Sequence, residues 1–189
     1  MKKNDSIILV GGFHEIYELC ETSNIDILGV FDANAISFEP FKIQYLGTDL
    51  TAKKEIQKFK NNKVVIIPDS PILREKLHKK YNEFGYSFGN IVSEKSIISK
   101  YSNIGIGVVI QNNCNVSVNA EIGDFTKLNV SANVMHDSKI GDYSTIAPNS
   151  VILGNVIIGK RCYIGTNSTI LPGVSICSDV TVGAGSVVT

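Results

Sequence analysis

From residue 92 to the end of the chain, every sixth residue is aliphatic. Seventeen successive positions in steps of six, from Val92 to Val188, hold Ile, Val or Leu, and no step is out of phase. An amphipathic helix repeats its apolar residues with a period of about 3.6, so this spacing does not describe one. A sustained short repeat of this kind is typical of a parallel β-helix, in which each repeat forms one face of a coil.

Two other columns of the repeat support the same fold. The residue four places after each aliphatic, from Val108 to Ser186, is always Val, Cys, Ala, Thr or Ser. The residue just before it is mostly Gly, Asn or Asp, which tolerate the left-handed backbone of tight turns. Three such faces make a coil of 18 residues, and successive coils are expected to stack about 4.8 Å apart. The resulting prism is narrow, in keeping with 16 glycines and no Trp in the chain.

Residues 1–90 show a different pattern, in which short apolar runs alternate with charged segments. This alternation predicts a small parallel sheet of the Rossmann-like βαβ type. We therefore predict an α/β domain over residues 1–90 and an all-β parallel β-helix over residues 91–189. The expected strands are Ser6–Val10, Ile27–Phe31 and Lys63–Ile67, and the expected helices are Glu15–Glu21, Thr51–Phe59 with Thr51 as its cap, and one that follows Ser70 with Pro71 near its first position.

The composition excludes several classes of protein. The chain has 18 basic and 18 acidic residues, which argues against a polybasic binder of nucleic acids or membrane surfaces. It has no apolar stretch of the length that a spanning helix needs, and its first residues lack a signal-peptide pattern, so a cytoplasmic location is expected. The four cysteines form no CxxC pair, so neither a disulfide nor a metal site is expected. Cys114 and Cys162 are predicted to be small buried hydrophobes.

The candidate for chemistry is His136, the one histidine in the repeat region, which is followed directly by Asp137. A carboxylate beside an imidazole can orient the ring and stabilise its protonated form, as a general base requires. Asp137 also fits the turn column, so a purely structural role is equally compatible with its position. Gly154 follows His136 by 18 residues, which predicts that it stacks one coil away with a backbone N–H open to a developing oxyanion. From the residues alone, a turn or packing glycine is the favoured interpretation of Gly154. His78, in a charged helix, is expected to be solvated.

Five segments together carry a resemblance to a known family. They are Ile7–Gly12, Phe31-Asp32, the hexapeptide repeats, the stretch Val134–Asp142 around the histidine, and Leu153–Gly159. In these segments, and over nearly its whole length, the chain resembles the sialic acid O-acetyltransferase and sugar-nucleotide N-acetyltransferase family of bacterial surface-glycan biosynthesis. The resemblance implies that the β-helix is left-handed.

The resemblance also implies acetyl transfer from acetyl-CoA in a homotrimer. His136 would be the base that deprotonates the acceptor, Asp137 would orient it, and the N–H of Gly154 would polarise the thioester carbonyl. Thr166 and Ala184 match positions that line the pantetheine arm, and they are expected one and two steps further along the same edge. The acyl donor would lie in a groove between neighbouring prisms.

Residues 1–90 would bind the nucleotide of the acceptor sugar. Gly11 and Gly12 end the first expected strand, where small residues let a phosphate approach backbone N–H groups. Asp32 directly follows the second expected strand, and it is placed like the acidic residue that meets a ribose or base. Phe13 and His14 complete the expected loop.

The sequence leaves alternatives to this function. We favour N-acetyl transfer to an amino-sugar nucleotide, and O-acetylation of sialic acid or another sugar is the close alternative. A non-catalytic assembly or sugar-nucleotide-binding homologue with a degenerate site is the next, because Phe13 and Glu15 alter the expected glycine loop and Glu15 would repel a phosphate there. A zinc enzyme of the γ-carbonic-anhydrase kind needs three histidine ligands, and the repeat region holds one. Thr145 stands where relatives often carry a second histidine.

Overall fold

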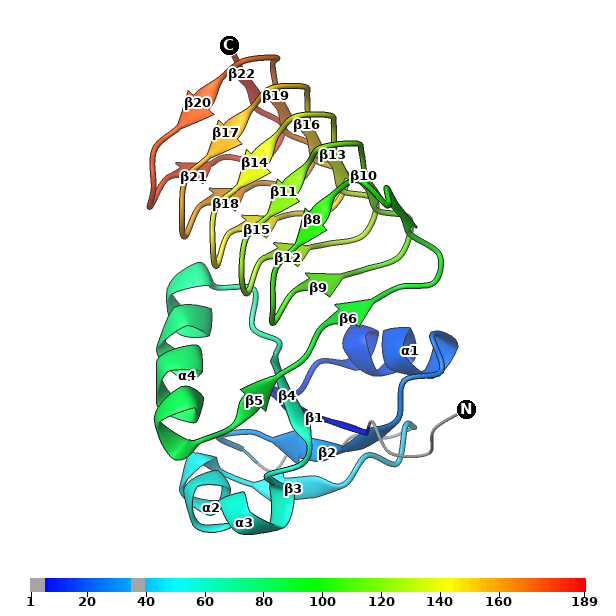
Figure 1. Ribbon diagram of the computed structural model, residues 1–189, viewed down its shortest axis with the longest axis vertical. Helices are drawn as coiled ribbons and strands as arrows, with labels where there is room; N and C mark the ends of the chain where they lie inside the picture. Colours follow the sequence, from blue (N-terminus) through cyan, green and yellow to red (C-terminus); the bar gives the residue numbers. More distant parts are fainter. Residues whose placement is uncertain (1–5, 35–39) are drawn as a thin grey trace.

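The computed structural model describes residues 6–34 and 40–189 and shows an α/β domain at one end of a β-helix (Figure 1). The first domain is a parallel five-stranded sheet in the order β3-β2-β1-β4-β5. Its elements are β1 (Ile7–Val10), α1 (His14–Thr22), β2 (Ile27–Phe31), β3 (Tyr45–Gly47), α2 (Asp49–Lys54), α3 (Ile56–Phe59), β4 (Lys63–Ile66), α4 (Pro71–Phe84) and β5 (Ser87–Phe88).

Alternate residues of β1 face opposite sides of this sheet, because side chains alternate along a strand. Ile7 and Leu9 pack with α1, whereas Ile8 and Val10 pack in the cluster that contains residues of α2, α3 and α4. The sheet is thus covered on both faces, as parallel sheets usually are. No helix in the described ranges has the length and apolar character needed to cross a membrane.

The α/β prediction for this domain is confirmed, with differences at several element boundaries. β2 has the predicted bounds, and α4 begins at Pro71 with the Ser70 hydroxyl accepting from the Leu73 N–H at 3.4 Å. The prediction that Thr51 caps a helix is wrong. That helix begins earlier, at Asp49, whose carboxylate pairs with Lys80 and accepts from the Tyr81 hydroxyl of α4. The short strands β3 and β5 were not predicted.

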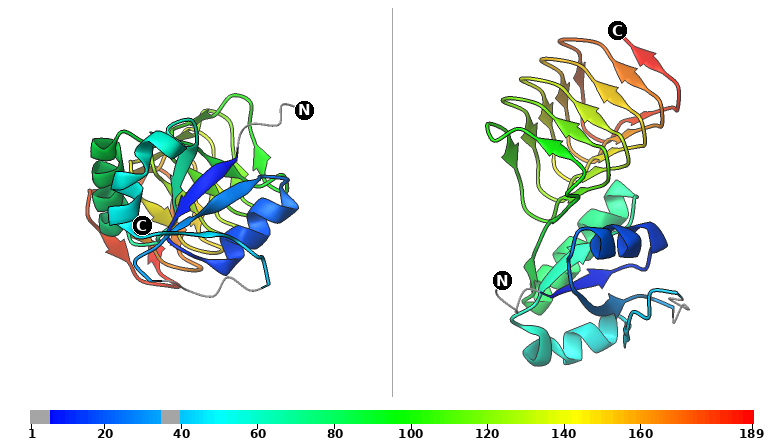
Figure 2. Two further views of the ribbon diagram at one scale, coloured as in Figure 1. Left: turned by 90° about the horizontal axis from the view of Figure 1, so that it is seen from below. Right: turned by 90° about the vertical axis from the view of Figure 1, so that its right-hand side faces the viewer.

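The second domain is a parallel β-helix whose coils stack away from the α/β domain (Figure 2). It contains three sheets, built from strands of two residues each. Each strand pairs with the strand one coil further along, as in Asn133↔Val151 and Val134↔Ile152, which confirms the predicted coil. The sheet orders are β21-β18-β15-β12-β9-β6, β22-β19-β16-β13-β10-β7 and β20-β17-β14-β11-β8. The left-handed winding stays a prediction of the resemblance.

The bounds of these strands follow the six-residue repeat. They are β6 (Ile91–Val92), β7 (Ile97–Ile98), β8 (Asn103–Ile104), β9 (Val109–Ile110), β10 (Asn115–Val116), β11 (Glu121–Ile122), β12 (Lys127–Leu128), β13 (Asn133–Val134), β14 (Lys139–Ile140), β15 (Thr145–Ile146), β16 (Val151–Ile152), β17 (Ile157–Ile158), β18 (Tyr163–Ile164), β19 (Thr169–Ile170), β20 (Ser175–Ile176), β21 (Thr181–Val182) and β22 (Val187–Val188). The second residue of each strand is the aliphatic member of its repeat.

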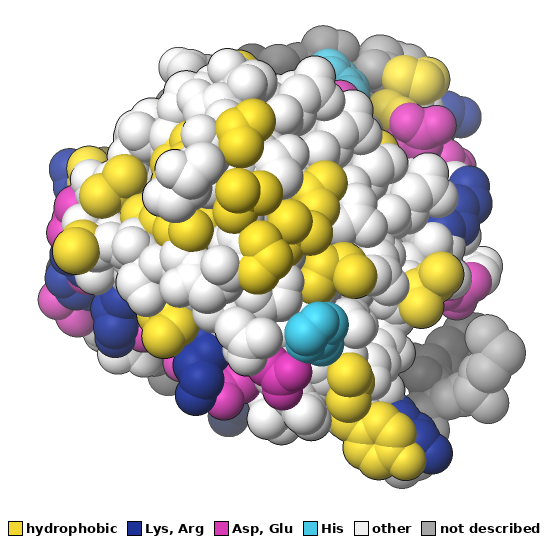
Figure 3. All heavy atoms as spheres, turned by 90° about the horizontal axis from the view of Figure 1, so that it is seen from above, with side chains coloured by type: hydrophobic (Ala, Val, Ile, Leu, Met, Phe, Trp, Pro, Cys, Tyr) yellow, Lys and Arg dark blue, Asp and Glu magenta, His cyan; other side chains and the backbone are white. Residues whose placement is uncertain are grey.

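The interior of the prism contains the two columns that the repeat predicts. The aliphatic residues form one continuous cluster with small partners, among them Ala120 and Ala132. Cys114 and Cys162 are buried in this cluster, as predicted, and all four cysteines are free. In the view onto the C-terminal end of the prism, apolar side chains gather at the centre (Figure 3). Val174, Val180 and Val188 are accordingly only partly buried there.

The turn column forms the three edges of the prism, and every one of its positions from 107 to 185 has a positive φ between 55° and 75°. We name one edge after the helix docked on it and one after His136, and we call the remaining one the third edge. The docked edge has Gly107, Phe125, Tyr143, Arg161 and Asp179; the His136 edge has Asn119, Asp137, Asn155 and Gly173; and the third edge has Asn113, Ser131, Asn149, Asn167 and Gly185. The bulky members Phe125, Tyr143 and Arg161 thus adopt the same left-handed turn as the glycines.

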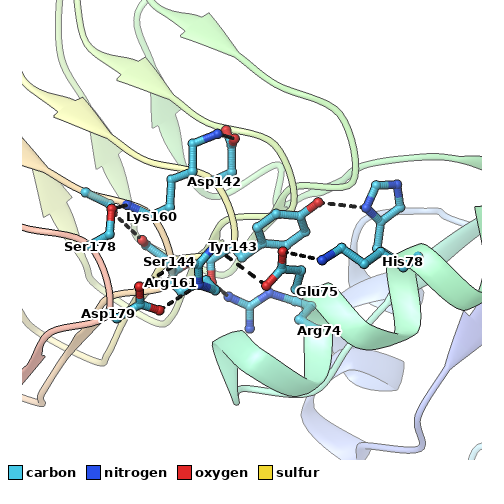
Figure 4. A network of polar contacts seen from close by, with 12 residues as sticks. Arg74, Glu75, His78, Asp142, Tyr143, Ser144, Lys160, Arg161, Ser178 and Asp179 are labelled. Atoms are coloured by element: carbon cyan, nitrogen blue, oxygen red, sulfur yellow. Dashed lines mark hydrogen bonds and ion pairs between the residues drawn. The ribbon is translucent and has the colours of Figure 1, made fainter.

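Helix α4 joins the two domains by packing on the docked edge (Figure 4). Its Arg74 is 1% exposed and donates hydrogen bonds to the backbone carbonyls of Phe125, Tyr143 and Ser144 in the β-helix. The same guanidinium also donates to the Pro68 and Asp69 carbonyls of the loop before α4. Burial lowers the pKa of Arg74 to about 10, so the group stays charged at neutral pH.

The prediction that His78 is solvated is wrong. Its ring stacks on Phe125 with centroids 3.9 Å apart, and its Nδ1 lies 2.8 Å from the Tyr143 hydroxyl. The sequence of this helix shows charged residues beside His78. It does not show that Phe125 and Tyr143 of the docked edge pack against the histidine ring. Partial burial against these rings lowers the pKa of His78, because it opposes the charged imidazolium.

A lysine of the β-helix makes the second connection between the domains. Lys127, on the face of the prism that meets the sheet, is 1% exposed and reaches the carboxyl end of β4. Its Nζ donates to the Ile67 carbonyl at 3.0 Å, pairs with Asp69 at 2.8 Å and lies 5.4 Å from the centre of the Phe13 ring. These contacts satisfy a buried ammonium group and align the sheet with the prism.

Candidate active site

The His136 edge holds an exposed histidine–carboxylate pair. His136 follows β13, in the turn where the chain leaves one face of the prism for the next, and Asp137 has the left-handed φ of that turn, 59°. Nδ1 of His136 lies 2.8 Å from Oδ2 of Asp137, and the two side chains are 51% and 45% exposed. An ionised carboxylate only accepts hydrogen bonds, so Nδ1 carries the proton and Nε2 is the basic nitrogen. The turn role and the pairing role of Asp137 are therefore compatible.

The hydrogen bonds around Asp137 favour its ionised form. The contact with His136 is the largest cause and a hydrogen bond from Asn119 the second, and together they lower the pKa of Asp137. The Asn119 side chain lies one coil earlier, with its Nδ2 3.0 Å from Oδ1 of Asp137. The carboxylate therefore stays negative through the pH range in which an imidazole exchanges its proton.

Gly154 lies directly beneath the His136 ring. A Cβ added to Gly154 would stand 2.6 Å from Cε1 and 2.7 Å from Nε2 of His136, closer than real contacts allow. The coils are held together at this point by the Asn155 N–H, which donates to the His136 carbonyl at 3.1 Å. The absence of a side chain at Gly154 thus lets the basic edge of the ring lie against the next coil, as the coil length predicts.

The N–H of Gly154 has no acceptor within the described ranges 6–34 and 40–189. At three equivalent positions, Ile106, Asp124 and Lys160, the N–H donates to an Asp or Ser side chain one coil further along. The residue one coil beyond Gly154 is Pro172, which has no side-chain acceptor. This proline is a feature that the sequence reasoning missed, although counting one coil onward could have found it. Among the described residues, the N–H of Gly154 is therefore free to donate to a ligand, as are those of Val118 and His136 at the same step of this edge.

The prediction that Thr166 and Ala184 continue the same edge is wrong. The strand register places Pro172 and Gly173 after Gly154, and the Gly173 N–H donates to the Gly154 carbonyl. Thr166 stacks instead under Gly185 of the third edge, whose N–H donates to its carbonyl at 2.8 Å. Thr166 follows Gly154 by two hexapeptide repeats, which is two faces of the prism rather than a full coil.

The glycine loop lies at the carboxyl ends of β1, β2 and β4, beside a cavity of about 230 Å³. Gly11, Gly12, Phe13, Asp32, Ile67, Pro68, Asp69 and Lys127 line this cavity. The Gly12 N–H donates to Oδ2 of Asp32 at 2.7 Å, and the Gly11 N–H donates to the Phe31 carbonyl at 2.9 Å. Both N–H groups predicted to meet a phosphate are thus already paired within the chain. The fold brings Asp32 to the loop, as predicted, and pairs it with that loop.

Two residues of the predicted sites lie elsewhere. His14 is the first residue of α1 and packs beside Tyr17 and Phe41, with ring centroids 5.9 and 6.1 Å apart, and it does not line the cavity. Thr145 is buried in the docking network, where its hydroxyl donates to the Asp69 carbonyl and accepts from Arg74. It therefore does not replace a second histidine on the His136 edge. Among the described residues, no three His, Cys, Asp or Glu side chains gather as a metal site would require.

Two protein-family models match the β-helix. Residues 119–154 match the model described as bacterial transferase hexapeptide (six repeats), and residues 155–189 match the one described as hexapeptide repeat of succinyl-transferase. A search of curated proteins found no match.

Solved structures match almost the whole chain. A histidine mutant of GDP-perosamine N-acetyl transferase from Caulobacter crescentus, in complex with CoA and GDP-perosamine, is 25% identical with a TM-score of 0.89, covering 97% of this chain and 88% of that chain. The acetyltransferase domain of PglB from Neisseria gonorrhoeae FA1090, in complex with acetyl coenzyme A, is 21% identical with a TM-score of 0.87, covering 98% and 91%. WeeI from Acinetobacter baumannii AYE is 23% identical with a TM-score of 0.74, covering 97% and 96%. The last two likenesses are evidence of fold alone.

Proposed function

Since this chain belongs to the hexapeptide-repeat acyltransferases, we propose that it transfers the acetyl group of acetyl-CoA to the amino group of a sugar nucleotide. The observation that supports this most strongly is the geometry of the His136 edge. A histidine with a free Nε2, a carboxylate on its Nδ1 and an unpaired N–H one coil away lie together on that edge, among the residues that the structure describes. These are the groups that acyl transfer to an amine requires.

The reaction follows from the roles of these groups. The acceptor amine attacks the thioester carbonyl carbon, and Nε2 of His136 takes the proton that the amine loses. Asp137 stabilises the imidazolium that forms. The carbonyl oxygen becomes negative in the tetrahedral intermediate and accepts from the Gly154 N–H. The intermediate collapses to the amide, the carbon–sulfur bond breaks, and the CoA sulfur leaves as a thiolate that takes up a proton.

We place the acyl donor between two copies of the chain in a homotrimer. Thr166 and Ala184 lie on the third edge and not on the His136 edge, so one copy does not bring all the proposed donor contacts together. A groove formed by the His136 edge of one copy and only that part of its neighbour's third edge that runs from Thr166 to Ala184 would do so. Gly154 would then serve both the acyl carbonyl and the wall of this groove.

We assign the acceptor nucleotide to residues 1–90 and the transfer reaction to residues 91–189. The cavity of about 230 Å³ at the sheet edge supports this division, because ligands of parallel α/β sheets bind outside the carboxyl ends of the strands. Asp32 is the group there that would accept from ribose or base donors, and Phe13 offers an aromatic face. Gly11 and Gly12 allow a close approach, although the Gly12 N–H must exchange Asp32 for a phosphate oxygen. We also assign His14 to nucleotide binding, although it lies on α1 and outside the cavity wall.

The experiment that tests the reaction is a panel of acceptors assayed for the free thiol of CoA. The purified chain is incubated with acetyl-CoA and with UDP-, GDP- or dTDP-linked amino sugars, and with sialic acid as a hydroxyl acceptor. Thiol release with one amino-sugar nucleotide and not with sialic acid supports the proposal. Release with sialic acid alone would replace N-acetyl by O-acetyl transfer. If no acceptor gives thiol release, thermal shifts are measured with acetyl-CoA and with each sugar nucleotide. Stabilisation without turnover indicates a binding protein, and no stabilisation by either indicates a chain that binds neither substrate.

A further inference from the structure

We propose that Asn119 is a positioning residue, which holds the Asp137 carboxylate in the orientation that aligns His136. This inference rests on the proposed function. Asn119 precedes Asp137 by one full coil, so the two occupy the same step of successive coils on the His136 edge. The Asn119 side-chain nitrogen donates to Oδ1 of Asp137 at 3.0 Å.

This contact completes a chain of three side chains. Oδ2 of Asp137 accepts from His136 at 2.8 Å, and Oδ1 accepts from Asn119, so each carboxylate oxygen has its own donor. The carboxylate cannot rotate about its Cβ–Cγ bond without losing one of them. Because His136 and Asp137 are about half exposed, two side chains alone would hold their mutual geometry weakly. The donor from the previous coil restricts that freedom.

The backbone of Asn119 is itself anchored. Its N–H donates to the Tyr101 carbonyl at 3.3 Å, and its φ is 58°. Asparagine tolerates this left-handed conformation better than most residues, as does glycine. Glycine would satisfy the turn without supplying a donor, and aspartate would put a second negative charge beside Asp137. Of the three residue types that dominate this column, asparagine is the one that meets both the turn and the carboxylate.

The simpler alternative is that Asn119 is present only because asparagine suits the left-handed backbone of this turn. Asn113 is the matched control, because it occupies the same step of the repeat on the third edge, with a φ of 59°. Asn119→Gly removes the donor while keeping a residue suited to the turn, and Asn113→Gly makes the same backbone change on an edge without His136. A difference in activity between the two variants therefore reports the side chain and not the turn.

Steady-state kinetics of the two glycine variants provide the first test. We expect Asn119→Gly to lower kcat about three- to tenfold, the scale of a partly exposed hydrogen bond to a charged group. The KM for acetyl-CoA should stay within about twofold, because uniform binding is not altered. Asn113→Gly should retain the wild-type kcat. Thermal melts of both variants separate a loss of folding from a loss of orientation.

The pH profile tests whether position 119 is coupled electrostatically to the His136–Asp137 pair, as the contact between Asn119 and Asp137 requires. Asn119→Asp adds a negative charge next to the pair, and this charge favours protonated His136. The acidic limb of kcat/KM should therefore move to higher pH, by about half a unit for an exposed charge one coil away. Asn113→Asp should leave that limb where it is in the wild type.

The inference is overturned if Asn119→Gly keeps the wild-type kcat, if both glycine variants lose activity equally, or if Asn119→Asp leaves the acidic limb unmoved. Failure of the proposed function has a different signature. If His136→Ala is as active as the wild type, the base assignment itself fails. If His136→Ala is inactive and Asn119→Gly is fully active, the base assignment holds and the role of Asn119 fails.

Discussion

The docked edge and the His136 edge of the prism have the same backbone and very different side chains. Both are built from the turn column of the same repeating coil, and both have positive φ at every turn. The docked edge carries Phe125, Tyr143 and Arg161, and α4 covers much of it, leaving Phe125 1% exposed. The His136 edge carries Asn and Gly beside Asp137, and the His136–Asp137 pair is about half exposed. One repeating turn therefore carries the docking contact of α4 on one edge and an exposed histidine–carboxylate pair on another.

The two edges differ in how the free-energy cost of the left-handed turn is offset. A side chain with a Cβ in left-handed backbone costs roughly 1–2 kcal/mol relative to its usual conformation, and small polar residues or glycine reduce that cost. Phe125 and Tyr143 adopt this unfavourable backbone conformation, and aromatic stacking offsets its free-energy cost. The centroid of the Phe125 ring lies 5.5 Å from that of Tyr143 and 3.9 Å from that of His78. The His136 edge uses residues suited to the turn and needs no covering helix. It can therefore stay open to a substrate.

The largest expected effect separates the two edges by function. His136→Ala should lower kcat by about 10²–10⁴, the range for a lost general base. Because the side chain is half exposed, the free energy of unfolding should change by less than about 0.5 kcal/mol. Thiol release and urea denaturation measure the two quantities. An unchanged kcat would show that the edge holds no catalytic base.

The next effect should appear in stability. Arg74→Met removes a buried guanidinium and leaves the carbonyls of Phe125 and Ser144 without this donor. We expect a loss of about 3–5 kcal/mol in the free energy of unfolding, as for other broken buried charge networks. The control is Lys76→Met on the exposed side of the same helix. Equal losses from both variants would mean that α4 does not hold the docked edge through Arg74.

A smaller effect should follow from supplying an acceptor to the Gly154 N–H. Pro172→Ser places a hydroxyl where Ser178 accepts from Lys160 on the docked edge. With its N–H engaged, Gly154 is less able to stabilise an oxyanion, and kcat should fall about 10- to 100-fold, less than for outright removal of such a donor. Pro148→Ser, at the same step of the repeat on the third edge, should keep the wild-type rate. Equal rates for both serine variants would refute the role given to Gly154.

The smallest effect concerns pH and the docked edge. The pKa of His78 is lowered mainly by burial, so the folded chain keeps the ring neutral while the unfolded chain protonates it below about pH 6.5. At this group the unfolded state then binds more protons, so the contribution of His78 to stability falls as the pH decreases through that value. His78→Gln should flatten this part of the stability curve, measured by urea denaturation at about pH 5 to 8. A slope equal to that of the wild type would assign the effect to other groups.

The repeat made much of the site predictable. The length of the coil alone placed Gly154 beside His136, and Asp137 was adjacent in sequence. The same arithmetic, applied to Thr166, would have shown that two repeats lead to another edge. The prediction that Thr51 caps a helix was wrong because threonine suits an N-cap, whereas the contacts of Asp49 with α4 favour a helix that begins at Asp49. Side-chain contacts between distant segments have no such signal in a single sequence.

The sequence by itself determined the β-helix and its coil, because each six-residue repeat carries its own inward aliphatic and its own turn, and neighbouring repeats only stack. It also determined the alternation of strands and helices before residue 90. The tertiary structure alone decided which edge α4 covers, that Arg74 and His78 belong to that contact, and that Lys127 crosses to the sheet. These outcomes depend on how two domains meet, and the local periodicity of either one does not encode that. The same packing left the His136 edge uncovered, with its histidine–carboxylate pair about half exposed.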